Sequence, residues 1–212
     1  MTETIKEIAT AVQNGKAKLI KELVPKAIEE GNTAQEILNE GLLAGMSVIG
    51  DRFSRNEAFV PEVLVAARAM NKGTELIKPL LAAEGNQPIG KAVIGTVQGD
   101  LHDIGKNIVK LMVESKNIEV TDLGVDVSPE AFVNAIKETG ATLVLCSALL
   151  TTTMPMIGEV VEAIKAAGLR DQVTIMVGGA PLTPEYAEQI GADIYTEDGG
   201  AAANAAAAAL TK

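Results

Sequence analysis

The sequence predicts an α/β protein in which a helical bundle precedes a five-stranded, parallel, doubly wound sheet. Apolar residues recur at helical spacing through the first part of the chain, and five short apolar runs alternate with helix-like segments after it. Such alternation is typical of a parallel sheet that helices cover on both faces. Between the parts, residues 82–90 are rich in Gly, Pro and polar side chains. We expect a helical cap domain at 1–84, a linker at 85–90 and an α/β domain at 91–212.

Four helices are expected in the first domain. Apolar residues at helical spacing predict one helix over 5–12 and a second over 16–30, in which Pro25 favours a kink. Thr33 and Glu36 have the spacing of a capping box at the start of the third helix. Pro61 suits the first turn of a fourth helix, which should end near residue 81.

The second domain should contain five strand–helix repeats of the Rossmann-like or flavodoxin-like kind. The expected strands are 91–97, 118–123, 142–147, 173–177 and 192–195. The expected helices are 104–115, 129–138, 154–167, 184–190 and an Ala-rich closing helix at 199–211. A strand order of 2-1-3-4-5 would place the first and third strands side by side. The loops that carry His102 and Ser147 would then meet at the switch point.

Composition narrows the function. Hydrophobic residues make up 47% of the 212 residues but aromatic residues only 2%, so the core must be aliphatic. A net charge of −10 argues against nucleic acid or an anionic membrane as partner. A single Cys rules out an internal disulfide and fits a reducing cytoplasm. The first residues do not have the pattern of a signal peptide, and no apolar stretch is long enough for a membrane span, so we expect a cytoplasmic protein.

The sole histidine, His102, lies in the loop after the first predicted strand. Asp100 can accept a hydrogen bond from one ring nitrogen and leave the other free for a metal. The loop is not a phosphate-binding P-loop, because five residues separate Gly99 from Gly105 and Asn107 replaces Ser or Thr. One His is too few for an ordinary zinc hydrolase. A nucleophilic triad is not expected either, because Cys146 follows an apolar run and should lie in a buried strand. A metal held by a macrocycle remains, because it needs only one axial protein ligand.

Three spaced motifs resemble those of cobalamin-binding domains, including the one in cobalamin-dependent methionine synthase. They are Asp100-x-His102-x-x-Gly105, Ser147-x-Leu149-x-Thr151 and Gly178-Gly179. Asp51-Arg52-Phe53 and Phe59-Val60-Pro61 resemble the helical cap that precedes such domains. The size and the two-part layout look like a corrinoid protein of the three-component methyltransferase systems.

The resemblance implies a role for each residue. His102 would bind cobalt as lower axial ligand, Asp100 would hold its far ring nitrogen, and Thr153 would complete this relay unless it caps a helix. The other cofactor-binding residues would be Gly99, Leu101, Asp103, Ile104, Gly105, Ser147, Leu149, Thr151, Gly178, Gly179 and Gly199, with Phe53 and Val60 in the cap. There is an alternative for several of these residues. The glycines could simply form turns, Gly199 could begin a helix, and the cap residues could be ordinary core residues.

The resemblance also implies a function. A donor-specific methyltransferase would load a methyl group onto the cobalt of cobalamin or a related corrinoid, and a second methyltransferase would pass it to a folate or a thiol. A reductive activator would be a further partner. The chain would then be the cofactor-bearing subunit of an enzyme system rather than a stand-alone enzyme. The alternatives are a cobalamin-responsive regulator and a mutase subunit. The methyl donor stays open among methoxylated aromatics, methylamines, methanol and betaines.

Overall fold

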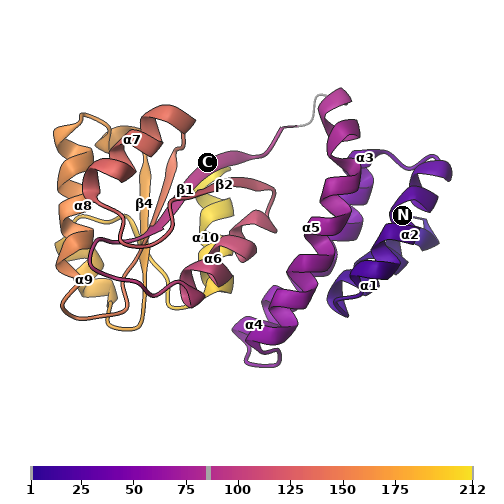
Figure 1. The fold of residues 1–212 in the computed structure, drawn as a ribbon, viewed down its shortest axis with the longest axis horizontal. Coiled ribbons are helices and arrows are strands. Elements are labelled where there is room, and N and C mark those ends of the chain that lie inside the picture. The colour runs from indigo at the N-terminus through magenta and orange to yellow at the C-terminus, as the bar shows by residue number, and fades with distance from the viewer. Residues whose placement is uncertain (1, 85–86, 212) are drawn as a thin grey trace. The chain divides into compact units, whose positions relative to one another are not determined.

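The computed structural model describes residues 2–84 and 87–211, which form two compact units, Met1–Gln87 and Pro88–Lys212 (Figure 1). Residues 85 and 86 of the predicted linker lie outside the described residues. Gly90, the last residue of the expected linker, is the first residue of a strand. Among the described residues, no helix has the length and apolar character that a membrane crossing requires.

The first unit is entirely helical, as predicted. Its elements are α1 (Glu3–Gln13), α2 (Ala17–Glu29), α3 (Ala34–Glu36), a π-helical segment η1 (Ile37–Leu43), α4 (Ala44–Ser54) and α5 (Val60–Ala83). The capping box of Thr33 and Glu36 is confirmed. The π-helical segment was not predicted, because a stripe of apolar residues does not distinguish an α-helix from a wider turn. Within it, a Cβ at Gly41 would lie 2.9 Å from Ile8 Cγ2, so the missing side chain lets η1 approach α1 closely.

The second unit is the predicted α/β domain, and its strand order, β2-β1-β3-β4-β5, is the predicted one. Its strands are β1 (Gly90–Thr96), β2 (Ile118–Asp122), β3 (Leu143–Ser147), β4 (Thr174–Gly178) and β5 (Ile194–Tyr195), all parallel. Its helices are α6 (Ile104–Glu114), α7 (Pro129–Thr139), α8 (Pro155–Ala166), the short η2 (Arg170–Gln172), α9 (Pro184–Gln189) and α10 (Gly199–Leu210). The predicted bounds agree within two residues.

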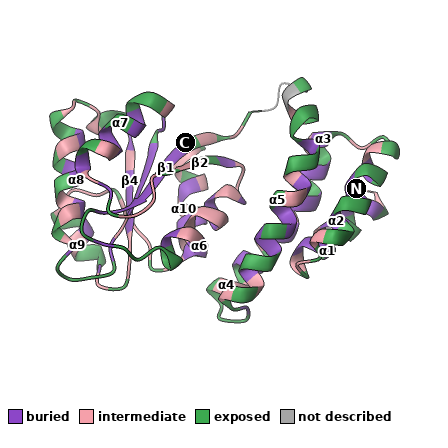
Figure 2. Ribbon diagram, in the orientation of Figure 1, coloured by how far each residue is buried: buried purple, intermediate pink, exposed green. Residues whose placement is uncertain are grey.

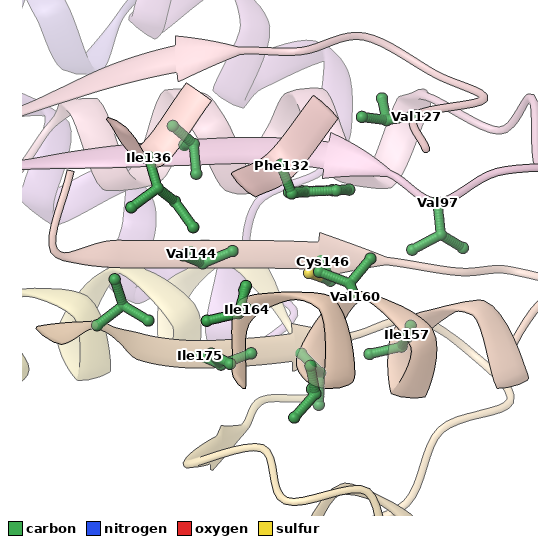
Figure 3. Close-up of a cluster of buried hydrophobic side chains, with 14 of the residues drawn as sticks. Val97, Val127, Phe132, Ile136, Val144, Cys146, Ile157, Val160, Ile164 and Ile175 are labelled. Atoms are coloured by element: carbon green, nitrogen blue, oxygen red, sulfur yellow. The ribbon is translucent and has the colours of Figure 1, made fainter. Parts of the chain in front are cut away.

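Helices cover both faces of this sheet. Figure 1 shows α6 and α10 on one face and α7, α8 and α9 on the other. The inner strands β1, β3 and β4 are accordingly buried along most of their length, whereas the edge strands β2 and β5 are less buried (Figure 2). On the face of α7 and α8, Phe132 is fully buried among aliphatic side chains (Figure 3). A Cβ at Gly95 would lie 2.8 Å from the Phe132 ring, so a glycine in β1 makes room for this buried aromatic side chain.

An ion pair between a buried lysine and a partly exposed aspartate ties the start of α6 to the end of β2. The Lys106 side chain is 2% exposed, and its Nζ lies 2.5 Å from Asp122 Oδ1 and 2.8 Å from Asn107 Oδ1. Burial raises the pKa of Asp122, but the hydrogen bond from Lys106 and further contacts outweigh it, so the pKa lies below the ordinary value. A cation in the first turn of a helix opposes the helix dipole, so Lys106 depends on this partner.

Replacing Phe132 by Ala should leave a cavity and lower the free energy of unfolding of the apoprotein by about 3–5 kcal/mol. Leu101→Ala is the matched control in the same unit, because this side chain is 72% exposed, and it should change the free energy by less than about 0.5 kcal/mol. Urea unfolding followed by circular dichroism measures both. Equal losses in the two variants would contradict the packing described.

Asp122→Asn should destabilise the apoprotein by about 1.5–3 kcal/mol at neutral pH, the range for a hydrogen bond to a charged group. Because folding lowers the pKa of Asp122, its contribution is present above the unfolded value of 3.8 and is lost as pH falls below it. The difference in unfolding free energy between wild type and variant should therefore shrink below pH 3.8. Urea unfolding across that range tests this, with Glu138→Gln, an exposed change, as control. A difference independent of pH would contradict the assignment.

Candidate functional site

The loop between β1 and α6 carries His102, whose ring is oriented by Asp100. The imidazole Nδ1 lies 2.7 Å from Asp100 Oδ1, which also accepts a hydrogen bond from the His102 backbone amide at 3.1 Å. The Asp100 side chain is fully buried, whereas half of the His102 side chain is exposed. Since an ionised carboxylate only accepts hydrogen bonds, Nδ1 carries the proton and Nε2 of the neutral ring keeps its lone pair.

Two donors from the loop after β3 hold the other oxygen of Asp100. Oδ2 accepts hydrogen bonds from the Leu149 amide at 2.8 Å and from the Thr153 hydroxyl at 2.7 Å. Burial alone would raise the pKa of Asp100, but these bonds and those from His102 outweigh it and hold the pKa far below its ordinary value. The carboxylate is therefore ionised at neutral pH and places a negative charge beside the imidazole.

Thr153 has the geometry that the predicted relay needs. It is buried, and its hydroxyl lies 3.0 Å from the Leu150 carbonyl as well as against Asp100. The alternative role as a helix N-cap is wrong, because α8 begins at Pro155 after Met154 and no side chain caps it. The three side chains of the predicted relay thus form one connected chain of hydrogen bonds.

The sheet brings the strand-end residues of two motifs together. Thr96 of β1 is in register with Ser147 of β3, and Ser147 is in register with Gly178 of β4. Ser147 and Gly178 are half-buried, and Thr151 is exposed in the loop that follows. The predicted tail-binding hydroxyls therefore lie at the same edge of the sheet as the His102 loop.

Exposed apolar side chains lie on both of these loops. Leu101 and Ile104 are 72% and 71% exposed, and Leu149 and Leu150 are each 42% exposed. The sequence reasoning included the first three and missed Leu150, which directly follows the Ser147-x-Leu149 pattern. Apolar groups around convergent polar ones are typical of a ligand-binding surface.

The predicted glycines have different structural reasons. A Cβ at Gly105 would meet nothing within 4 Å, so space is open beside it. At Gly179, with φ +138°, a Cβ would lie 1.9 Å from the Ala148 carbonyl oxygen. The close approach that this glycine permits is therefore to the protein's own backbone. Gly199 is buried and begins α10. A Cβ there would lie 3.3 Å from Ile108 Cγ2, so close packing against α6 explains this glycine.

Two polar residues that sequence reasoning missed hold the His102 loop. The buried Thr96 hydroxyl donates to the His102 carbonyl at 2.8 Å. Asp126 Oδ1 accepts a hydrogen bond from the Gly99 amide at 2.7 Å. Both residues follow or end an apolar strand at the edge where parallel sheets bind ligands, and that position was the signal that could have identified them.

The remaining predicted residues lie at the margins of this loop or outside it. Asp103 precedes α6 without capping it and accepts a hydrogen bond from the Asn107 side chain at 3.3 Å. Phe53 and Val60 belong to the helical unit, where both are half-buried. Cys146 is buried in β3, and burial raises the pKa of its thiol to about 12, which agrees with its expected exclusion as a nucleophile.

The residues at this edge fit a corrinoid. A half-exposed imidazole with a fixed tautomer offers one nitrogen, apolar side chains flank it, and open space lies beside Gly105. In the described part of the chain, no three His, Cys, Asp or Glu residues are grouped closely enough to hold a metal ion. A corrin ring supplies its own in-plane nitrogens, so a single imidazole suffices as the protein's ligand.

Comparisons with known proteins identify the family of this chain. Residues 4–78 and 90–207 each match a family described as B12 binding domain. The chain is 44% identical over 192 residues to dimethylamine corrinoid protein 3 of Methanosarcina acetivorans, covering 91% of this chain and 90% of that protein. It is 41% identical over 210 residues to the trimethylamine corrinoid protein of Methanosarcina barkeri, covering 98% and 97%.

Solved structures share the fold across both units. The methanol:cobalamin methyltransferase complex of Methanosarcina barkeri contains a chain that matches with a TM-score of 0.90 at 29% identity, over 99% of this chain and 80% of that one. A cobalamin-binding protein from Desulfitobacterium hafniense matches with a TM-score of 0.78 at 31% identity, over 98% and 97%. With both units matched and relatives aligned over nearly their full length, the chain belongs to the family of B12-binding corrinoid proteins.

Proposed function

We propose that this protein is a corrinoid methyl carrier, the cofactor-bearing subunit of a methyltransferase system. One observation carries the proposal: a His102–Asp100–Thr153 hydrogen-bonded chain lies at the ligand-binding edge of a B12-binding domain. Relatives that match almost the whole chain are corrinoid proteins named for dimethylamine and trimethylamine. None of the compared relatives favours the regulatory alternative.

When bound, the corrinoid supplies a cobalt ion that accepts and releases a methyl group. His102 would offer the lone pair of Nε2 to that metal. Asp100 would hold the Nδ1 proton and keep the ring from rotating, since the carboxylate is itself fixed by hydrogen bonds from His102, Leu149 and Thr153. The charge of Asp100 would also make the imidazole a stronger electron donor.

The surroundings of His102 would bind and shield the group. Leu101, Ile104 and Leu149 are exposed and would cover apolar parts of the ring, which keeps water from the metal. Ser147 and Thr151 would donate hydrogen bonds to the polar tail. Phe53 and Val60 would supply an apolar cover from the helical unit.

The partners follow from the carrier role. A donor-specific methyltransferase is expected because the structural relative comes from a methanol:cobalamin methyltransferase complex. An acceptor methyltransferase and a reductive activator would complete the cycle, and the free Cys146 fits the cytoplasm as its location. Dimethylamine and trimethylamine relatives are nearly equally similar, at 44% and 41% identity, so methylamines are the first donors to assay.

His102 is the only histidine of the chain, which permits an unambiguous test of cobalt ligation. Protein with natural nitrogen should show a triplet of nitrogen hyperfine lines in the Co(II) electron paramagnetic spectrum. Labelling with ¹⁵N-histidine should turn this triplet into a doublet, and His102→Ala should abolish the doublet. A triplet that persists in labelled protein would mean that the cofactor's own benzimidazole is the ligand, and the assignment of His102 would be wrong.

The purified holoprotein should carry methyl groups but should not demethylate any donor alone. Dimethylamine, trimethylamine, methanol, a betaine and a methoxylated aromatic would each be offered with and without a donor-specific methyltransferase. We expect the cobalt to be methylated in the presence of the matching methyltransferase, and absorption spectroscopy would detect this methylation. Turnover of any donor by the isolated holoprotein would contradict the carrier role.

A further inference from the structure

Asp126 contacts the His102 loop from another part of the sheet. It lies between β2 and α7, and its Oδ1 accepts a hydrogen bond from the Gly99 amide at 2.7 Å. Its own amide donates to the Asp100 carbonyl at 3.0 Å. Asp126 therefore binds the backbone on both sides of the Gly99–Asp100 peptide, directly before the side chain that orients the imidazole.

The backbone of Asp126 is held in an uncommon conformation. Its φ is +54°, in the left-handed region where a residue other than Gly is strained by roughly 1 kcal/mol. Among residues other than Gly, Asp and Asn tolerate this region best, and the side chain of either can offer an oxygen to the Gly99 amide. Gly99 itself has φ +81°, so both residues of this hydrogen bond have a positive φ. Because Asp126 adopts this strained conformation while binding the Gly99 amide, we expect the hydrogen bond to stabilise the loop.

The sheet order explains why this contact matters for His102. β1 lies between β2 and β3, so the loop after β1 is flanked by the loops after both neighbours. The loop after β3 holds the Asp100 carboxylate through Leu149 and Thr153. The loop after β2 holds the Asp100 backbone through Asp126. The side chain and the backbone of Asp100 are thus held by two different loops.

We infer that Asp126 is a positioning residue for the histidine ligand: through the Gly99 amide it fixes the turn that aims the Asp100 carboxylate at His102. The inference rests on the proposed function, since it concerns the same imidazole. Asp126 itself touches neither the ring nor the Asp100 carboxylate in any described contact. It acts by narrowing the range of orientations open to His102, which strengthens the binding of that nitrogen to cobalt.

Two variants separate the hydrogen bond from the other properties of Asp126. Asp126→Asn keeps an oxygen acceptor and tolerates a positive φ. Asp126→Gly removes the acceptor, relieves the strain and retains the backbone amide that donates to Asp100. Glu130→Gln is the charge control, because it removes one negative charge from an exposed position in the first turn of α7.

The first measurement uses apoprotein and does not involve cobalt. Hydrogen exchange of the Gly99 amide, followed by nuclear magnetic resonance, should be several-fold faster in Asp126→Gly than in wild type. Asp126→Asn and Glu130→Gln should resemble wild type. Exchange at Gly99 that is unchanged in Asp126→Gly would show that the hydrogen bond does not hold the loop, and the inference would be wrong.

The second measurement uses Co(II) holoprotein in which His102 is labelled with ¹⁵N. Free imidazole of natural nitrogen is added and competes with His102 for the cobalt. The imidazole concentration that replaces half of the doublet by a triplet should fall about fivefold in Asp126→Gly, which corresponds to about 1 kcal/mol. It should change less than about twofold in Asp126→Asn and Glu130→Gln. Equal values in wild type and Asp126→Gly, or an equal fall in all three variants, would overturn the inference. A wild-type protein without the doublet would instead refute the proposed ligation of cobalt by His102, on which the inference rests.

Discussion

A fully buried carboxylate must find hydrogen-bond donors for both oxygens, and this requirement organises the site around Asp100. Its Oδ1 accepts hydrogen bonds from the His102 amide and ring, and its Oδ2 accepts them from the Leu149 amide and the Thr153 hydroxyl. Burial raises the cost of the charge, and four donors more than offset it. The loops after β1 and β3 are consequently joined at one ion, and neither loop can move without leaving a buried charge unsatisfied.

Further contacts hold the segments next to Asp100. Gly179 approaches the Ala148 carbonyl so closely that no side chain would fit, and Ala148 directly precedes the Leu149 amide that binds Asp100. Lys106 ties α6 to β2 just beyond the histidine loop. The Thr96 hydroxyl donates a hydrogen bond to the carbonyl of His102. These contacts place the histidine by its backbone as well as by its ring.

The glycines show how a family motif and local packing overlap. Resemblance assigns Gly178, Gly179 and Gly199 to the cofactor tail. In the structure, Gly199 packs against Ile108 and Gly179 against Ala148, while open space lies beside Gly105. Small residues at such positions serve the fold first, because a side chain there would displace the strand ends or the helix that form the site. Any space they leave for a ligand depends on that packing.

The sequence by itself determined the two-part organisation, the strand order and the His102–Asp100 pair. These depend on local patterns: apolar periodicity, turn residues and a two-residue spacing that lets a carboxylate reach its neighbour's ring. Tertiary structure decided which distant groups meet this pair, including Thr153, whose place in the relay was implied only by the family resemblance. Thr153 and Leu149 lie about fifty positions from Asp100 in the chain and meet it only because β1 and β3 are adjacent. Asp126 and Thr96 carry no motif, and their roles arise because parallel strands end at one edge, where loops distant in sequence share hydrogen bonds.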